Sequence, residues 1–310
     1  MQKDTKWKSF FAHNHRYADV INGLGCGGKQ VVGESDLAEA DGESGSKQRD
    51  ILKRTAFGAN FALIGLENQE CPDYELPLRI LFYDGKSYER QLSVIKKEVR
   101  SNAEGLKSGE FLYGFKKDSR LHPVITFVLY SGKEPWDGAE SLHELLDFKG
   151  IPEELKGMAS DYRINVVDIR RFEQTDVFKT DVKQVFDFIR CSEDREALLR
   201  LVEQDDSYRN MEEDAVDVLA SYTNSKELIK SKEYQEGGRT DMCKAIRDLM
   251  EDSRAEGMKS GIQQGIGQGR LETTRSIATQ MLQDGTISLE KIARFCQLTV
   301  EEVEALRVGN

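Results

Sequence analysis

Two carboxylates and an amide near the start of the chain are residue types that could support phosphodiester chemistry. Glu67 and Gln69 follow the apolar run Phe61–Leu66, and Asp50 lies 17 residues before Glu67. Hard divalent cations prefer oxygen ligands of this kind. A cation so held can activate water and stabilise charge on a phosphodiester. The residues therefore indicate a candidate metal site built on Asp50 and Glu67.

Two β-strands must bring these side chains together. Phe61–Leu66 is an uninterrupted apolar run that ends at polar residues, which is typical of a buried strand. Because side chains alternate along a strand, Glu67 and Gln69 point to the same face. A second segment begins at Ile51–Leu52, and a hairpin of the two would place Asp50 beside Glu67. The alternative is that both carboxylates face water at strand ends.

Four short stretches around these residues follow one family pattern: Arg49-Asp50, Ala56-Phe57-Gly58, Ile64–Gln69 and Leu76–Arg79. They resemble the Rpn family of recombination-promoting nucleases and transposases, and the pattern extends from about residue 7 to about residue 270. The resemblance implies an α/β fold of the restriction-endonuclease-like PD-(D/E)XK type, with a mixed sheet flanked by helices. It further implies cleavage of DNA with little sequence preference, linked to recombination or mobile elements.

The resemblance also implies roles for individual residues. Asp50 and Glu67 would bind Mg²⁺, or Mn²⁺, and Gln69 would assist the attacking water. The wider superfamily usually has Lys at this third position, and Gln cannot act as a cationic base or neutralise the transition state. Asp19 lies in a predicted helical region, residues 7–22. In the PD-(D/E)XK fold an acid of the first helix sometimes joins the metal site, and family members often have Asp at this position. A solvent-facing Asp19 is the alternative.

The composition of the chain excludes several classes of protein. A net charge of −11 over 310 residues does not suit a protein that coats nucleic acid through overall basic charge. No apolar run approaches the roughly 18 residues of a membrane span, and no secretion signal follows Met1. No two cysteines form a CxxC pair, which argues against structural zinc and disulfides and suits a reducing cytoplasm. The cysteines are Cys26, Cys71, Cys191, Cys243 and Cys296.

One region of this acidic chain is basic. Residues 86–122 contain nine Lys or Arg and five acids, a local net charge of +4. A long helix, predicted from apolar spacing over Leu78–Val94, carries the first of these cations behind the sheet. A basic region beside a metal site is what DNA binding requires. A solvated helix face is the alternative.

Two other motifs have simpler interpretations than the chemistry their letters suggest. Gly23–Gln30 resembles a phosphate-binding loop, but Gln30 occupies the position that needs Ser or Thr, and a helix precedes it. We interpret it as a turn that leads into a short strand over Gln30–Val32, followed by a loop over 33–49. His13–His15 spells the letters of another nuclease class, and we expect only a surface loop or helix start there.

The rest of the chain predicts two more strands and then helices. Pro123–Tyr130 and Tyr162–Ile169 are β-rich runs, and the sequence is helical beyond Phe178. We expect a C-terminal all-helical extension after the sheet. The predicted parts are a nuclease-like core (1–175), a helical domain (176–250), a glycine-periodic stalk or linker (251–285) and a small helix-turn-helix-like tail (286–310).

The last two parts suggest contacts with protein. Gly257, Gly261, Gly265 and Gly269 recur every four residues and would form one stripe on a helix, which suits a homo-oligomer through the C-terminal helices. A flexible polar linker is the alternative. Ile287–Leu306 suggests two helices with caps at Ser288 and Thr299. Its second helix presents glutamates, so we expect it to pack on protein rather than enter a DNA groove.

Two functions follow as hypotheses. The first is a Mg²⁺-dependent DNA endonuclease that uses Asp50, Glu67, Gln69 and Asp19. The second is a catalytically weak nucleic-acid- or protein-binding assembly module on the same fold. Metal binding at Asp50 and Glu67 separates them, because only the first requires it.

Overall fold

A mixed five-stranded sheet forms the centre of the computed structural model, which describes residues 2–39, 51–57, 60–102, 104–222 and 235–308. Its strands follow the order β1-β2-β3-β4-β5; the first three are antiparallel and the last three are parallel. The predicted α/β fold class, a mixed sheet flanked by helices with a C-terminal helical extension, is confirmed. The strands are β1 (Leu37–Glu39), β2 (Ile51–Phe57), β3 (Asn60–Gln69), β4 (Val124–Tyr130) and β5 (Asn165–Asp168).

The pairing of β2 with β3 fixes which side chains share a face. Ile51 pairs with Leu66, and Lys53 pairs with Ile64. Lys53 is fully buried and donates from Nζ to the carbonyl of Ala12 at 2.6 Å, so its face of the sheet meets the N-terminal helices. The other face therefore carries the alternate residues of β3, Glu67 among them. The predicted hairpin is confirmed, and β3 continues through the polar residues that end its apolar run.

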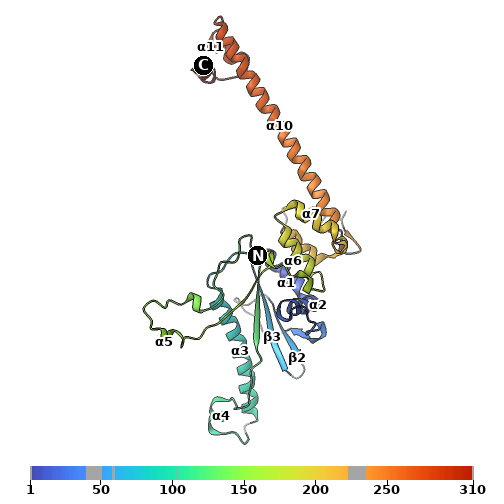
Figure 1. The fold of residues 1–310 in the computed structure, drawn as a ribbon, viewed down its shortest axis with the longest axis vertical. Helices are drawn as coiled ribbons and strands as arrows, with labels where there is room; N and C mark the ends of the chain where they lie inside the picture. The colour runs from blue at the N-terminus through green and yellow to red at the C-terminus, as the bar shows by residue number, and fades with distance from the viewer. Residues whose placement is uncertain (1, 40–50, 58–59, 103, 223–234, 309–310) are drawn as a thin grey trace. The chain divides into compact units, whose positions relative to one another are not determined.

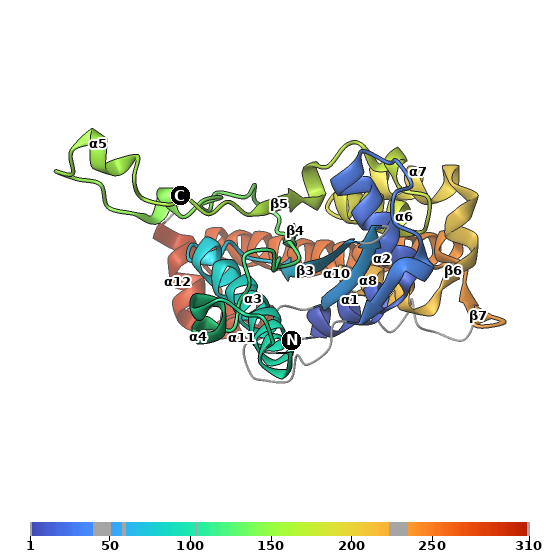
Figure 2. The ribbon, with the colours of Figure 1, turned by 90° about the horizontal axis from the view of Figure 1, so that it is seen from below.

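Helices cover both faces of this sheet. α1 (Gln2–Ala12) and α2 (Asn14–Val20) lie on one side and α3 (Leu76–Ser101) lies on the other (Figure 1, Figure 2). The apolar face of α3 packs on the parallel strands, where Leu76 and Ile80 cluster with Val128 and Ile164. This is the helix predicted over 78–94, and it is longer at both ends.

A second helical layer packs on α1. Lys6 Nζ donates to the carbonyl of Asp217 at 3.1 Å, and Trp7 Nε1 donates to the hydroxyl of Tyr222 at 3.3 Å. The helices predicted beyond Phe178 are thereby confirmed. The remaining elements before the C-terminal helices are α4 (Ser108–Tyr113), α5 (Glu153–Lys156), α6 (Val182–Cys191), α7 (Arg195–Gln204), α8 (Glu213–Ser221), β6 (Met211–Glu212), β7 (Gln235–Glu236) and β8 (Arg239–Thr240).

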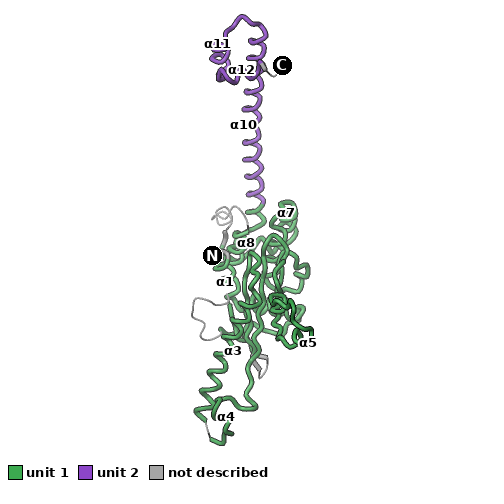
Figure 3. The backbone as a smooth tube through the Cα atoms, turned by 90° about the vertical axis from the view of Figure 1, so that its left-hand side faces the viewer, with its two compact units in different colours: residues 1–246 green, residues 247–310 purple. Residues whose placement is uncertain are grey.

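The chain divides into two compact units, residues 1–246 and residues 247–310 (Figure 3). The four-part division expected from the sequence is finer, and its boundaries stay predictions. α10 (Met242–Asp284) starts within the first unit and continues through the glycine-periodic segment as a helix. Among the described residues, no helix combines the length and the apolarity needed to cross a bilayer.

The second unit ends in the expected pair of helices, α11 (Leu289–Cys296) and α12 (Val300–Val308). Gln297 joins them in the left-handed conformation. Thr299 caps α12, because its hydroxyl accepts from Glu302 N at 3.2 Å while the Glu302 carboxylate accepts from Thr299 N. The apolar faces of the pair cluster with the end of α10, as expected for helices that pack on protein: Ala278, Ile292, Ala293 and Val303.

One predicted strand, Gln30–Val32, is wrong. Its backbone is bound by a side chain instead of a neighbouring strand: Asn22 Oδ1 accepts from Val31 N and from Val32 N, both at 2.9 Å. Asn22 Nδ2 also donates to Val32 O at 2.8 Å. β1 forms a few residues later, inside the expected loop, and residues 40–49 of that loop lie outside the described residues. A π-helical turn (Ile21–Gly25) leads into the Gly-rich turn. A phosphate-binding loop follows a strand, so the Gly-rich turn does not have the structure of such a loop.

Candidate active site

Glu67 and Gln69 lie together near the end of β3, as the alternation of the strand predicted. Glu67 is buried and pairs with Val128 of β4 in the parallel register. Gln69 Nε2 donates to Glu67 Oε1 at 3.4 Å. The carboxylate is therefore oriented by its neighbour on the same face, where the sheet ends.

Arg79 supplies a cation to this pair. It lies in the first turn of α3, and its Nη2 donates to Glu67 Oε1 at 3.1 Å. Its Nη1 donates to a second carboxylate, that of Asp73. Arg79 Nε is buried without a hydrogen-bond partner, while the side chain as a whole is 29% exposed. The guanidinium thus lies at the edge of the site with part of its hydrogen-bonding capacity unused.

The sequence pattern contains Arg79, but spacing alone gives it no role. The available signal was Gln69, because the family pattern that this stretch resembles would lack its usual cation there. Only the approach of α3 to the end of β3 shows that Arg79 contacts Glu67.

The second predicted metal ligand, Asp50, lies outside the described residues. The described part of β2 begins at Ile51, which pairs with Leu66, the residue before Glu67. Within the described ranges, no three His, Cys, Asp or Glu side chains gather in a group that could hold a metal ion. The Asp50–Glu67 metal site therefore stays a prediction, and Glu67 is its described half.

Asp19 performs a structural task. It is only 3% exposed, so the solvent-facing alternative is wrong. Its carboxylate accepts from Lys179 N at 2.8 and 2.9 Å, and from Thr180 N and Thr180 Oγ1 at 2.7 Å each. These bonds hold the turn before α6 against α2. None of these four hydrogen bonds joins Asp19 to Glu67.

A cavity of about 530 Å³ opens between α3 and the strands β2 and β3. Leu63 lines it, and Leu63 shares a face of β3 with Glu67. Four residues along a strand span about 13 Å. The cavity therefore lies on the same face of the sheet as the Glu67–Gln69–Arg79 group, a short distance along β3.

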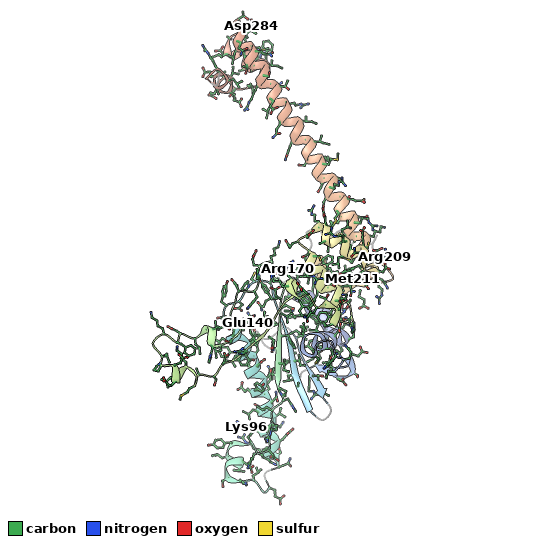
Figure 4. All side chains as sticks on the ribbon, viewed as in Figure 1. Lys96, Glu140, Arg170, Arg209, Met211 and Asp284 are labelled. Atoms are coloured by element: carbon green, nitrogen blue, oxygen red, sulfur yellow. The ribbon has the colours of Figure 1, made fainter. Side chains whose placement is uncertain are left out.

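The walls of this cavity combine basic and apolar side chains. Arg54, Arg90, Arg120 and His122 contribute nitrogen groups, and Glu98 is the acid among the lining residues. Two of the arginines belong to the basic region predicted over 86–122; Lys96, another of its cations, is labelled on α3 in Figure 4. The apolar lining residues are Leu52, Leu63, Val94 and Ile95.

A second arginine–carboxylate group lies on the opposite side of the sheet. Arg16 of α2 is fully buried, and it donates to both Asp181 oxygens at 2.7 Å, to Asp214 at 2.5 Å and to Glu212 at 2.8 Å. Burial alone would lower the pKa of Arg16, but the hydrogen bonds and charges of Asp181 and Asp214 outweigh it and raise the pKa. This group joins α2 to the segment before α6 and to α8.

Comparison with known proteins gives no relative for the chain. It matches no protein-family model, no curated protein and no solved structure. Function must therefore be argued from the residues themselves.

Proposed function

We propose that this protein is a metal-dependent DNA endonuclease that hydrolyses phosphodiester bonds with low sequence specificity. It would act in the cytoplasm, in recombination or in the movement of mobile elements. Asp50 and Glu67 would hold Mg²⁺ or Mn²⁺. When bound, the cation supplies an activated water and stabilises charge on the phosphate. The observation that carries the proposal is the hydrogen-bonded Glu67–Gln69 pair on the sheet face that also carries an arginine-lined cavity.

The surrounding residues fit the other tasks of such an enzyme. Gln69 donates to one oxygen of Glu67, which supports a role for its amide in positioning water beside that carboxylate. Arg79 provides the positive charge that Gln69 cannot, and a guanidinium suits a phosphate with its paired donors. Arg54, Arg90 and Arg120 would contact the phosphate backbone, because Lys and Arg contacts to phosphates supply most sequence-independent affinity for DNA.

Cleavage of supercoiled plasmid tests this proposal. We expect nicking with Mg²⁺ or Mn²⁺, lost after chelation, and absent from Asp50→Ala and Glu67→Ala. Glu70→Ala is the matched control, because Glu70 is exposed and directly follows the motif, beyond the end of β3. No cleavage by folded wild-type protein, or cleavage that survives both substitutions, would reject the endonuclease.

The alternative is a binding module of the same fold that turns over little or no DNA. It is favoured by the ion pair of Glu67 with Arg79, because the guanidinium competes with a metal ion for the carboxylate. Calorimetric titration with Mn²⁺ separates the two: the endonuclease requires binding that Glu67→Ala abolishes. DNA binding without metal binding would support the module.

We further propose that α10 mediates self-association. Met258, Ile262 and Ile266 form an apolar stripe on α10 and are 69%, 54% and 54% exposed. Each Gly in the same segment costs about 1 kcal/mol of helix stability relative to Ala. Packing against a second copy of α10 would offset this cost, because it buries the apolar stripe. Sedimentation should show an oligomer that Ile262→Asp dissociates and Gln263→Asp does not. A wild-type monomer would contradict this.

A further inference from the structure

The cavity on the α3 face has a fixed third wall, the segment that contains Arg120 and His122. Gln91 of α3 holds this segment with both ends of its amide: His122 N donates to Oε1 at 2.7 Å, and Nε2 donates to His122 O at 3.1 Å. Tyr88 adds a bond one turn earlier, where its hydroxyl accepts from Val124 N at 3.1 Å. The cavity is thus bounded by two strands, a helix and a segment hydrogen-bonded to that helix.

The lining of the cavity matches an anionic ligand that has an apolar body. Three arginines and one glutamate leave an excess of positive charge, while Leu52, Leu63 and Ile95 offer an apolar surface. A volume of about 530 Å³ is within the range of sites for small molecules and cofactors. A phosphate track alone would need the arginines but not the apolar side chains beside them.

We propose that this cavity receives the base of an unpaired nucleotide, so that the substrate is DNA with a single-stranded or locally opened segment. The inference rests on the proposed endonuclease function and names its substrate class. The apolar residues pack against the base, and guanidinium planes stack on it or bind its phosphate. A base in an intact duplex is stacked and paired, and it cannot enter a cavity without being flipped out.

The position of the cavity is consistent with one strand that reaches both places. Leu63 and Glu67 are about 13 Å apart along β3. Successive stacked nucleotides rise about 3.4 Å each. The base in the cavity would therefore lie about four nucleotides from the bond at Glu67 in a stacked strand, and fewer in an extended one.

Fluorescence anisotropy tests this inference with a labelled thymidine oligonucleotide. A length of about 12 nucleotides is within the usual range for one single-strand site. The comparison strands are an abasic strand of equal length and a duplex of equal length, all in chelator so that no cleavage occurs. We expect the intact strand to bind about tenfold more tightly than the abasic strand, which is the order of effect of one or two stacked bases. We also expect it to bind more tightly than the duplex.

Two substitutions on α3 separate the cavity from the surrounding charge. Val94→Trp fills the cavity from a position that is 57% exposed, so the change adds bulk without entering the core. It should remove the advantage of the intact strand and leave the abasic affinity unchanged. Ser93→Trp, at the exposed neighbouring position outside the lining, should keep the advantage.

The possible outcomes distinguish the two proposals. Equal binding of intact and abasic strands by the wild-type protein would overturn the base cavity and leave the endonuclease to its own cleavage test. An advantage that survives Val94→Trp would also overturn the cavity. Failure to bind all three DNAs in chelator would overturn the base cavity, while plasmid cleavage with Mg²⁺ or Mn²⁺ decides the endonuclease separately.

Discussion

The two arginine–carboxylate groups of this protein use the same chemistry for different ends. Arg16 is fully buried and bonds to three carboxylates from α6's leading turn, β6 and α8. Arg79 is partly exposed, bonds to two carboxylates and keeps a buried Nε without a partner. The Arg16 guanidinium has all its donors bonded, and two of its partners, Glu212 and Asp214, line a separate cavity of about 550 Å³. The Arg79 group lies where β3 ends and α3 begins.

The difference between Arg16 and Arg79 shows that a charged side chain can either stabilise the fold or remain available for chemistry. A buried charge whose hydrogen bonds are all satisfied holds segments together, and removal of one partner leaves the others uncompensated. A charge at the edge of a site, with donors unused, can exchange partners at little cost in stability. Arg16 fits the first description and Arg79 fits the second.

Removal of the buried arginine should have the largest effect. Arg16→Ala leaves Asp181, Asp214 and Glu212 without their shared cation, and we expect the free energy of unfolding to fall by about 3–5 kcal/mol. Urea denaturation followed by circular dichroism measures this change. A loss below about 1 kcal/mol, the scale of a surface ion pair, would erase the contrast with Arg79.

Removal of the partly exposed arginine should act on rate rather than on stability. Arg79→Ala is expected to slow plasmid nicking about 100-fold, the scale of one lost transition-state donor. Its free energy of unfolding should fall by less than that of Arg16→Ala, because the Arg79 guanidinium is 29% exposed, although Glu67 is buried. Arg79→Lys keeps the charge and should recover part of the rate. Unaltered nicking by Arg79→Ala would remove Arg79 from the site.

A rise to alkaline pH should have the smallest effect, measured as the stability difference between wild type and Arg16→Ala. The folded-state pKa of Arg16 is raised above its ordinary value, so its stabilisation is fully present below that value and is lost only as pH rises beyond it. The stability difference between wild type and Arg16→Ala should therefore be constant from about pH 7 to about pH 10. The lowered pKa of Lys53, caused by its burial, is common to both proteins and cancels. A difference that shrinks in this window would show that the cluster depends on another group.

Local patterns in the sequence predicted the elements that carry the site. The apolar run before Glu67, the β-rich run before Tyr130 and the helix of α3 are all present, and strand alternation correctly put Glu67 and Gln69 on one face. These features depend on neighbours in the chain.

Features that depend on distant partners were not predictable in this way. Val31 and Val32 have strand-forming side chains, but the Asn22 side chain binds their backbone first. Asp19 is an acid in a helix, as a site residue would be, yet its bonds go to a turn 160 residues later. The contact of Arg79 with Glu67 likewise requires the path of the chain between them, which spacing does not give.

The long reach of Arg16 has a consequence for synthesis of the chain. Its partners Asp181 and Asp214 follow it by 165 and 198 residues. At the usual 5–20 residues per second, about 10 to 40 s separate translation of Arg16 from translation of Asp214. During that time the aromatic side chains of α1, Trp7 and Phe10, lack the helical layer that covers them in the finished protein. α1 is thus made well before the helical layer that covers it, and its apolar side chains wait for that layer through most of the synthesis of the region between them.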